Sequence, residues 1–372
     1  MKILYVITST ETGGAEKALS ALSAAMASQG HQVRIICLKP LGRVAAEMQR
    51  NGLDVKSIYG KLPGKVVRRL KTEIELFQPD IVHAMLFRAI EYARLACGGK
   101  TVRLIVTPHF DLSKKPFLFR LADRLLKEKD TLAVAESMAT AEYLINHQGY
   151  RKDKVYLLPN GVDRSLFCRD NSLRVMMRNK YSFHVKTLVF ICVARLAAVK
   201  DPLTLVQAFR NVWMRFPDVR LIYVGEGEER AKLEPYIRES GMQKCVQLVG
   251  EQKDINAYLN MADVFVLPSV EESLPLSLLE AICVGLPCIV SRVGDMPLWV
   301  EHGKNGFVFP PGDITLLSCF MNEMVGDNEK RHLMGDKSLE KSTRITDNFQ
   351  QYQQIYQQVI SGEFSRENNL IP

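Results

Sequence analysis

The sequence contains no apolar run that approaches the ~18–20 residues needed to span a bilayer, so we expect no membrane-spanning helix. Residues 1–10 are only briefly apolar and no small-residue cleavage site follows them, which favours a first core strand over a signal peptide. The eight cysteines are scattered without a C-x-x-C pair, and Cys37, Cys192 and Cys283 lie in apolar runs. These features predict buried free thiols in a reducing compartment, and therefore a cytoplasmic protein.

Two motifs of common cofactor and metal sites are also absent. There is no D-x-D carboxylate pair to chelate a divalent cation, and the histidines do not have the spacing of metal ligands. The sequence also lacks the G-x-G-x-x-G fingerprint, which argues against a conventional dinucleotide oxidoreductase. We therefore expect neither a metal nor another cofactor.

The charge that is present is mainly positive. A net charge of +8 favours anionic partners, and much of it lies in residues 61–71 and 114–129. In the second segment, apolar residues such as Leu121 and Leu125 interleave with Arg120 and Arg124. This pattern is typical of an amphipathic helix that could rest on an anionic membrane surface, at the inner face of the cell membrane. The alternative is the solvated face of a helix packed on its own domain. We expect no nucleic-acid partner.

The length and the periodicity indicate two α/β domains. With 372 residues, 47% of them hydrophobic and 24% charged, the chain can bury two cores and is not disordered. Short β-branched runs alternate with stretches of helical period, which predicts two doubly wound parallel sheets covered by helices on both faces. The predicted strands are Ile3–Thr8, Val33–Leu38, Asp80–His83, Leu104–Thr107, Leu132–Ala135, Val155–Leu158, Thr187–Val193, Val219–Val224, Val246–Val249, Val264–Leu267, Cys288–Ser291 and Phe307–Phe309.

A polar and basic segment, residues 163–184, separates the two sets of strands and has no strand pattern. We therefore predict an N-terminal domain at 1–165, a connection at 166–184 and a C-terminal domain at 185–346. Residues 347–363 have aromatic and apolar side chains at helical spacing, which predicts a terminal helix that covers another surface. Because ligands of open parallel sheets bind beyond the carboxyl ends of the strands, we expect a ligand cleft between the domains.

The strongest motif is the segment from Pro268 to Pro287, which follows a predicted strand and opens a helix. We expect Ser273 to cap this helix and Pro275, which has no N–H, to lie in its first turn. The N–H groups of Leu274, Leu276 and Ser277 would then form an anion site for a diphosphate. Glu280 lies roughly 6 Å along the helix axis from this anion site, at ~1.5 Å per residue, which is about the step from a diphosphate to the adjoining ribose. Glu272 precedes the helix on the other side of the anion site, where the sugar of a nucleotide sugar would lie. The alternative is that both glutamates are ordinary surface residues.

A pair of cations forms the second motif. Arg195 stands at the end of the predicted strand Thr187–Val193, and Lys200 lies in the loop that follows. A guanidinium fork and an ammonium at a strand's carboxyl end are suited to phosphate oxygens. The alternative is an ordinary ion pair for Arg195 and a solvated Lys200.

Weaker signals come from two glycine turns and one histidine. Gly14 follows the first strand and Gly225 follows a strand of the second set, and each permits close backbone approach to a ligand, although tight turns are common. His109 comes at the end of a first-domain strand and could hydrogen-bond a sugar or an acceptor. A capping or core histidine is the alternative reading.

Taken together, these motifs resemble the retaining glycosyltransferases of family 4, which have the GT-B fold of two Rossmann-like domains. The glycine loop with Gly14, the segment Leu158–Asp163, the pair Arg195 and Lys200, and Glu272 to Glu280 as an E-x7-E signature carry the similarity over nearly the whole chain. Ser273-Leu274 departs from the family's frequent Gly-Phe, Asp295 stands where a second glycine is common, and Leu298 replaces a frequent Glu.

The resemblance implies a donor domain at 185–346, an acceptor-side domain at 1–165, and a terminal helix that crosses back to the acceptor-side domain. It further implies sugar transfer from a nucleoside-diphosphate sugar to an acceptor hydroxyl with retention, in cell-surface polysaccharide or glycolipid synthesis. The expected catalytic residues are Arg195, Lys200, Glu272 and His109; the expected donor-binding residues are Gly14, Gly225, Ser273, Leu274, Leu276, Ser277 and Glu280. The expected acceptor is a glycan or a polyprenyl-linked lipid.

Two rival functions fit the same architecture. A nucleotide-sugar epimerase would isomerise a single substrate without an acceptor, and a non-catalytic protein would only bind the nucleotide sugar. The intact set Arg195, Lys200, Glu272 and Glu280 argues against the second rival, because a site without catalytic duty usually loses such costly charges.

Overall fold

The computed structural model describes residues 1–11, 13–98, 102–109 and 117–363. The chain divides into two compact units: residues 1–160 with the C-terminal segment that begins at Asn348, and residues 161–347. Thr12 of the first glycine turn and residues 114–116 of the basic segment lie outside the described residues.

The first unit is built on a seven-stranded sheet with the order β3-β2-β1-β4-β5-β6-β7. All neighbouring strands are parallel. The central strands β1 and β4 are buried along almost their whole length, as expected where helices cover both faces of a sheet. The strands are β1 (Lys2–Ile7), β2 (Gln32–Cys37), β3 (Asp54–Ser57), β4 (Ile81–Met85), β5 (Arg103–Thr107), β6 (Leu132–Ala135) and β7 (Val155–Leu157).

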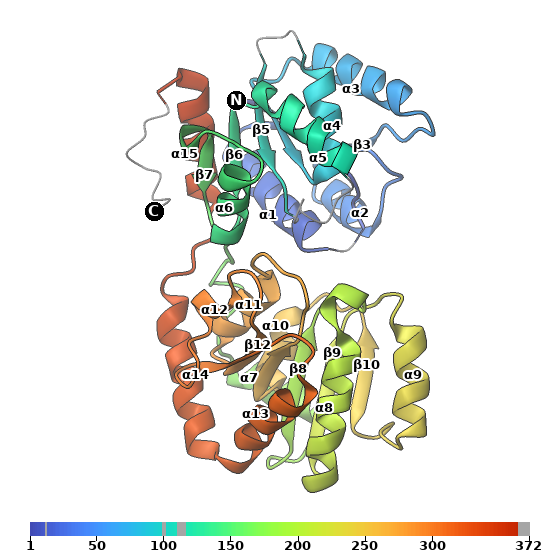
Figure 1. Cartoon of the computed structure of the whole chain (residues 1–372), viewed down its shortest axis with the longest axis vertical. Helices are drawn as coiled ribbons and strands as arrows, with labels where there is room; N and C mark the ends of the chain where they lie inside the picture. The colour runs from blue at the N-terminus through green and yellow to red at the C-terminus, as the bar shows by residue number, and fades with distance from the viewer. Residues whose placement is uncertain (12, 99–101, 110–116, 364–372) are drawn as a thin grey trace. The chain divides into compact units, whose positions relative to one another are not determined.

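Helices pack on each face of this sheet around a separate apolar core (Figure 1). One core contains residues of α3 (Pro63–Phe77), α4 (Phe87–Ala96) and α6 (Met138–Asn146). The other contains residues of α1 (Gly14–Ser28), α2 (Arg43–Arg50) and α15 (Phe349–Ser361). The helix α5 (Phe117–Leu126) completes the unit.

The terminal helix α15 confirms the predicted return of the chain to the first domain. Tyr356 is fully buried, and its hydroxyl lies 2.7 Å from Nδ1 of His83 on β4. His83 Nε2 lies 2.8 Å from the hydroxyl of Thr107, so this network joins the helix to two strands of the sheet. The aromatic side chains at helical spacing thus cover the sheet of their own unit.

The second unit has a six-stranded parallel sheet with the order β10-β9-β8-β11-β12-β13. Its single large core includes every residue of β8 and β11. The strands are β8 (Leu188–Val193), β9 (Val219–Val224), β10 (Val246–Gly250), β11 (Val264–Leu267), β12 (Cys288–Ser291) and β13 (Gly306–Phe309). The helices are α7 (Asn171–Lys180), α8 (Pro202–Arg215), α9 (Arg230–Glu239), α10 (Ile255–Met261), α11 (Leu276–Val284), α12 (Met296–Trp299), α13 (Ile314–Gly326) and α14 (Asn328–Ser342).

The two sheets confirm the α/β fold class predicted from the sequence. All eight cysteines are free, and Cys37, Cys192 and Cys283 are buried as expected. Within the described residues, no helix combines the length and the apolar character that crossing a membrane would require.

The basic segment that the sequence suggested as a connection contains the helix α7, which packs in the second unit. Its arginines are held by Asp263, which precedes β11: Arg174 Nη2 lies 2.6 Å from one carboxylate oxygen and Arg178 Nη1 lies 3.3 Å from the other. Asp263 also accepts a hydrogen bond of 2.8 Å from the Val189 N–H. The charges that gave this segment a linker-like composition therefore anchor it to the sheet.

We expect Asp263→Ala to destabilise the second unit by about 3 kcal/mol, because it leaves the nearly buried Arg178 without its ion-pair partner. Both tryptophans, Trp213 and Trp299, lie in this unit, so urea unfolding can be followed by their fluorescence. The matched control is Asp336→Ala, whose exposed pair with Arg169 should contribute less than ~1 kcal/mol. Equal effects of the two substitutions would contradict the anchoring role of Asp263.

Candidate active site

The chain order of the second sheet reverses between β8 and β11. In open parallel sheets, ligands bind at such a switch point, beyond the carboxyl ends of the strands. The loop after β8 carries Arg195 and Lys200, and the loop after β11 carries Glu272 and leads into α11. The two strongest sequence motifs therefore flank the switch point of one sheet.

Arg195 is an exposed cation at the end of β8. Its side chain makes no ion pair or hydrogen bond with any residue in the described part of the chain, whereas its backbone carbonyl accepts a 3.3 Å hydrogen bond from the hydroxyl of Tyr223. The backbone is thus held while the guanidinium remains available. The planar guanidinium could donate two parallel hydrogen bonds to oxygens of a phosphate or a carboxylate.

Lys200 and Glu272 form an ion pair between the two loops. Glu272 Oε1 also accepts a 3.0 Å hydrogen bond from the hydroxyl of Ser269, which is fully buried. The backbone joins the same loops, because the Val270 N–H donates to the Val199 carbonyl at 2.9 Å. The side chain of Lys200 is therefore held by an ion pair with Glu272 and is not freely solvated.

Glycines allow the loops around this site to pack closely. A Cβ at Gly225 would come within 1.9 Å of the Ala194 carbonyl oxygen, and one at Gly227 within 2.3 Å of the Leu196 carbonyl oxygen. Gly294, with φ +52°, faces the carbonyl oxygens of Glu272 and Ser273, 2.3 and 2.4 Å from the position a Cβ would take. Gly225 therefore has a structural role, because it lets the loop after β9 pack on the loop after β8, and Gly294 holds the loop that carries Glu272.

The structure corrects the predicted start of the helix in the E-x7-E segment. Helix α11 begins at Leu276 with Pro275 as its N-cap, and it has no side-chain cap. Ser273 is not the N-cap; its carbonyl instead accepts a 2.8 Å hydrogen bond from the Asp295 N–H. Since proline fixes the extended entry into the helix, the first turn starts later than the serine pattern suggests.

The remaining predicted donor-binding residues of this segment lie just before α11 or in its first five residues. Leu276, Ser277 and Glu280 are partly exposed, whereas the Leu274 side chain is buried in the core. The N–H groups in the first turn of an α-helix have no partner within the helix and carry a partial positive charge. Together with Arg195 and Lys200 they make this edge of the sheet attractive to a diphosphate.

Two predicted residues, Gly14 and His109, belong to the first unit. Gly14 begins α1 after β1 and has open space where a Cβ would lie. His109 follows β5 with φ 54°, an uncommon conformation for a non-glycine residue, and its Nε2 is buried without a hydrogen-bond partner among the described residues. Burial lowers the pKa of His109, while nearby Glu136 acts to raise it.

Sequence reasoning missed Glu136 and Ser269. Glu136 is 1% exposed, directly follows β6, and has one carboxylate oxygen without a partner among the described residues. Its position directly after a predicted buried strand could have indicated a carboxylate at the edge of the first sheet. The spacing of Ser269 to Glu272 could likewise have indicated a hydrogen bond within the loop.

The two halves of the chain match two sequence families. Residues 176–341 match the family described as Glycosyl transferases group 1, and residues 12–166 match Glycosyltransferase Family 4. Between them, these matches cover most of the chain.

Individual proteins show the same similarity. N-acetyl-alpha-D-glucosaminyl L-malate synthase of Bacillus anthracis is 27% identical over 301 residues, which are 76% of each chain. The UDP-Gal:alpha-D-GlcNAc-diphosphoundecaprenol alpha-1,3-galactosyltransferase of Escherichia coli is 33% identical over 175 residues, 46% of this chain and 44% of that protein.

The similarity of fold extends over nearly the whole chain. The crystal structure of Anabaena Alr3699/HepE in complex with UDP superimposes with a TM-score of 0.85 at 21% identity, covering 97% of this chain and 100% of the other. The matched families, the two parallel sheets and the charged residues at the switch point agree with one another. The chain therefore belongs to the family 4 glycosyltransferases, and it is a glycosyltransferase with the GT-B fold of two Rossmann-like domains.

Proposed function

We propose that this glycosyltransferase moves a sugar from a nucleoside-diphosphate sugar to an acceptor hydroxyl with retention of the anomeric configuration. The observation that carries the proposal is that the loop with Arg195 and Lys200 and the loop that leads into α11 follow neighbouring strands at the β8/β11 switch point. The two cations and the N-terminus of α11 each favour negative charge nearby. A departing diphosphate is the group on which such charge develops.

In the proposed reaction, the bond between the anomeric carbon and the diphosphate oxygen breaks through a loose, oxocarbenium-like transition state. The acceptor oxygen forms the new bond to the same face of this carbon, and its proton passes to the departing diphosphate. Positive groups stabilise the diphosphate as its charge grows, which lowers the barrier because the charge is greater there than in the bound substrate. Because the protein supplies this charge, we propose that no metal is required.

The two motif carboxylates have separate roles in this proposal. Glu280, on the helix, accepts hydrogen bonds from the ribose hydroxyls. Glu272, held by Lys200 and Ser269, accepts from hydroxyls of the transferred sugar. The ion pair orients the carboxylate of Glu272, which suits an acceptor of hydrogen bonds. His109, with its buried and unpartnered Nε2, is proposed to bind a hydroxyl of the sugar or the acceptor.

For the substrates, we propose a UDP-sugar donor and a lipid-linked or glycan acceptor in polysaccharide or glycolipid synthesis. The donor is suggested by the UDP complex of the Anabaena protein and by the UDP-Gal in the name of the Escherichia coli relative. That relative's name also includes a diphosphoundecaprenol.

We further propose that α5 rests on an anionic membrane at its cytoplasmic face. Leu121 and Leu125 on this helix are 42% and 70% exposed, and the neighbouring Arg120 and Arg124 are exposed as well. Apolar side chains flanked by cations suit the boundary between lipid headgroups and acyl chains.

The function is tested by measuring the thermal stability of the full chain with UDP-, GDP- and ADP-sugars, followed by hydrolysis assays without an acceptor. A bound donor at ~100 times its Kd adds about 2.7 kcal/mol, a shift of several degrees. We expect one nucleotide to stabilise the protein and its sugar to be released slowly. Binding without any turnover would favour a non-catalytic protein, and isomerisation of the sugar would favour an epimerase.

Arg195→Ala is expected to lower kcat by about 10²–10³ and to change donor affinity much less, because the guanidinium acts mainly on charge that develops in the transition state. Steady-state kinetics and calorimetric titration of UDP measure the two effects separately. The control is Arg210→Ala, an exposed arginine on α8 of the same unit, which should behave as wild type. Wild-type kcat in Arg195→Ala would remove this residue from the site.

Glu280→Gln should weaken donor binding about tenfold, because a neutral amide replaces a charged acceptor of two hydroxyl groups. The affinity for UDP should fall with that for the UDP-sugar, since the affected contact is to the ribose. Glu239→Gln, an exposed substitution at the end of α9, serves as control. Unchanged affinity for UDP in Glu280→Gln would refute the ribose assignment.

A further inference from the structure

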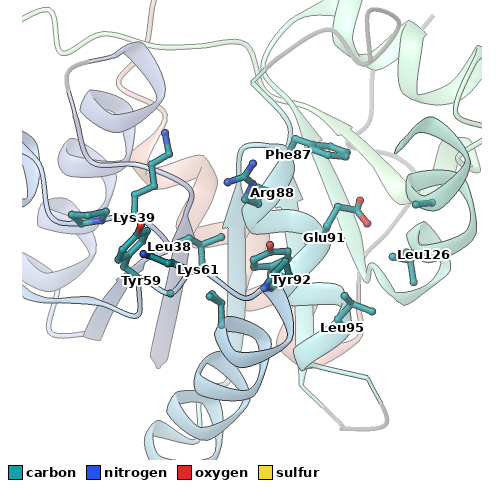
Figure 2. Close-up of a pocket in the computed structure, with 15 residues that line it drawn as sticks. Leu38, Lys39, Tyr59, Lys61, Phe87, Arg88, Glu91, Tyr92, Leu95 and Leu126 are labelled. Carbon is teal, nitrogen blue, oxygen red and sulfur yellow. The ribbon is translucent and has the colours of Figure 1, made fainter. Parts of the chain in front are cut away.

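The first unit contains a cavity of about 990 Å³ that the reaction at the second unit's sheet does not use (Figure 2). It lies at the carboxyl edge of the first sheet, where Lys39 follows β2, Tyr59 follows β3 and Phe87 follows β4. Helices α3, α4 and α5 complete its walls. This volume is at the upper end of the ~300–1,000 Å³ that small-molecule sites occupy.

Most of the cavity wall is apolar and part of it is exposed. Tyr59 and Leu95 are each 49% exposed, and Tyr92 and Leu126 line the cavity between the helices. Large apolar side chains that remain in contact with water at the wall of a cavity favour an apolar occupant, because covering them is favourable. A sugar or a simple anion would leave this wall hydrated.

Three cations line the same cavity: Lys39, Lys61 and Arg88. All three are exposed, and within the described ranges none makes an ion pair or side-chain hydrogen bond. In the view of Figure 2, Lys39 and Lys61 lie near Tyr59, and Arg88 lies between Lys39 and Glu91. Helix α4 also begins here, at Phe87 and without a side-chain cap, so the positive end of its dipole adds to their field.

The one carboxylate in the lining does not neutralise these cations. Glu91 is 9% exposed, and Arg94 Nη1 lies 2.6 Å from its carboxylate. Arg94 belongs to a buried cluster that also contains Asp123 and Asp130. The three lining cations therefore outnumber the one lining carboxylate, and the rest of the cavity wall is mainly apolar.

We propose that this cavity binds a lipid phosphate, with its alkyl or isoprenyl chain along the apolar wall and its phosphate at Lys39, Lys61 and Arg88. Cations and a mainly apolar wall in one cavity match an anionic amphiphile. The binding site is independent of the transfer reaction; only its use, as the site that holds the lipid anchor of the acceptor, rests on the proposed function.

The test is calorimetric titration of the full chain with farnesyl phosphate, and with farnesol and inorganic phosphate as the two halves of that probe. We expect farnesyl phosphate to bind at least about tenfold more tightly than either half, since each buried methylene adds about fourfold and the phosphate adds charge-assisted hydrogen bonds. Equal binding of farnesyl phosphate and inorganic phosphate would overturn the proposal.

Variants locate the site within the unit. Arg88→Gln and Leu95→Asn should each weaken farnesyl phosphate binding about tenfold, the first through lost hydrogen bonds and the second through lost apolar contact. Arg68→Gln, an equal change of charge on the exposed face of α3, is the matched control and should have no effect. Equal losses in Arg88→Gln and Arg68→Gln would show general charge attraction and would refute the site.

Two further measurements distinguish lipid binding in the cavity from attraction to a membrane surface and from the proposed transfer function. Binding to phosphatidylglycerol vesicles reports attraction to a membrane surface; if Leu95→Asn leaves both vesicle and farnesyl phosphate binding unchanged, the cavity is not a lipid site. Stabilisation by UDP, measured in parallel, shows that each variant is folded. A protein that binds farnesyl phosphate but no nucleotide sugar would contradict the proposed function while leaving the lipid site intact.

Discussion

The ion pair between Lys200 and Glu272 joins the loops that follow β8 and β11 at the place where the strand order of the second sheet reverses. Those loops contain the residues that can bind a diphosphate and a sugar. Lys200 and Glu272 form an ion pair with each other, and the hydroxyl of Ser269 donates a hydrogen bond to the Glu272 carboxylate. Arg195 makes no ion pair or side-chain hydrogen bond with any described residue, so its guanidinium is available to an anion. This balance holds the residues in place before a substrate binds.

Backbone packing sets the position of that pair. Gly225 and Gly227 let the loop after β9 approach the loop after β8, and Gly294 lets the loop after β12 hold the carbonyls of Glu272 and Ser273. Side chains at these glycines would have to displace backbone atoms. The geometry of the charged site therefore depends on these neutral residues as well as on the charged ones, and one sheet supports all four loops.

The sequence predicted most of the strands because strands buried on both faces are continuous apolar runs. It missed β3 (Asp54–Ser57), an edge strand in which Val55 alone is buried. It gave the region of α7 a linker-like composition because Arg174 and Arg178 look solvated until Asp263, distant along the chain, is seen to bind them. The motif residues at the switch point could be found because each follows a predicted strand. The Lys200–Glu272 pair, 72 residues apart, and the cavity of the first unit could not, because both depend on which strands are neighbours.

The central claim is that Arg195, Lys200 and the first turn of α11 surround a diphosphate. A crystal structure of the protein with UDP tests it most directly. The account predicts diphosphate oxygens within hydrogen-bonding distance, ~2.7–3.2 Å, of the Arg195 guanidinium, the Lys200 ammonium and an N–H in the first turn of α11. A diphosphate bound elsewhere, with Arg195 and Lys200 both directed away from it, would contradict the account.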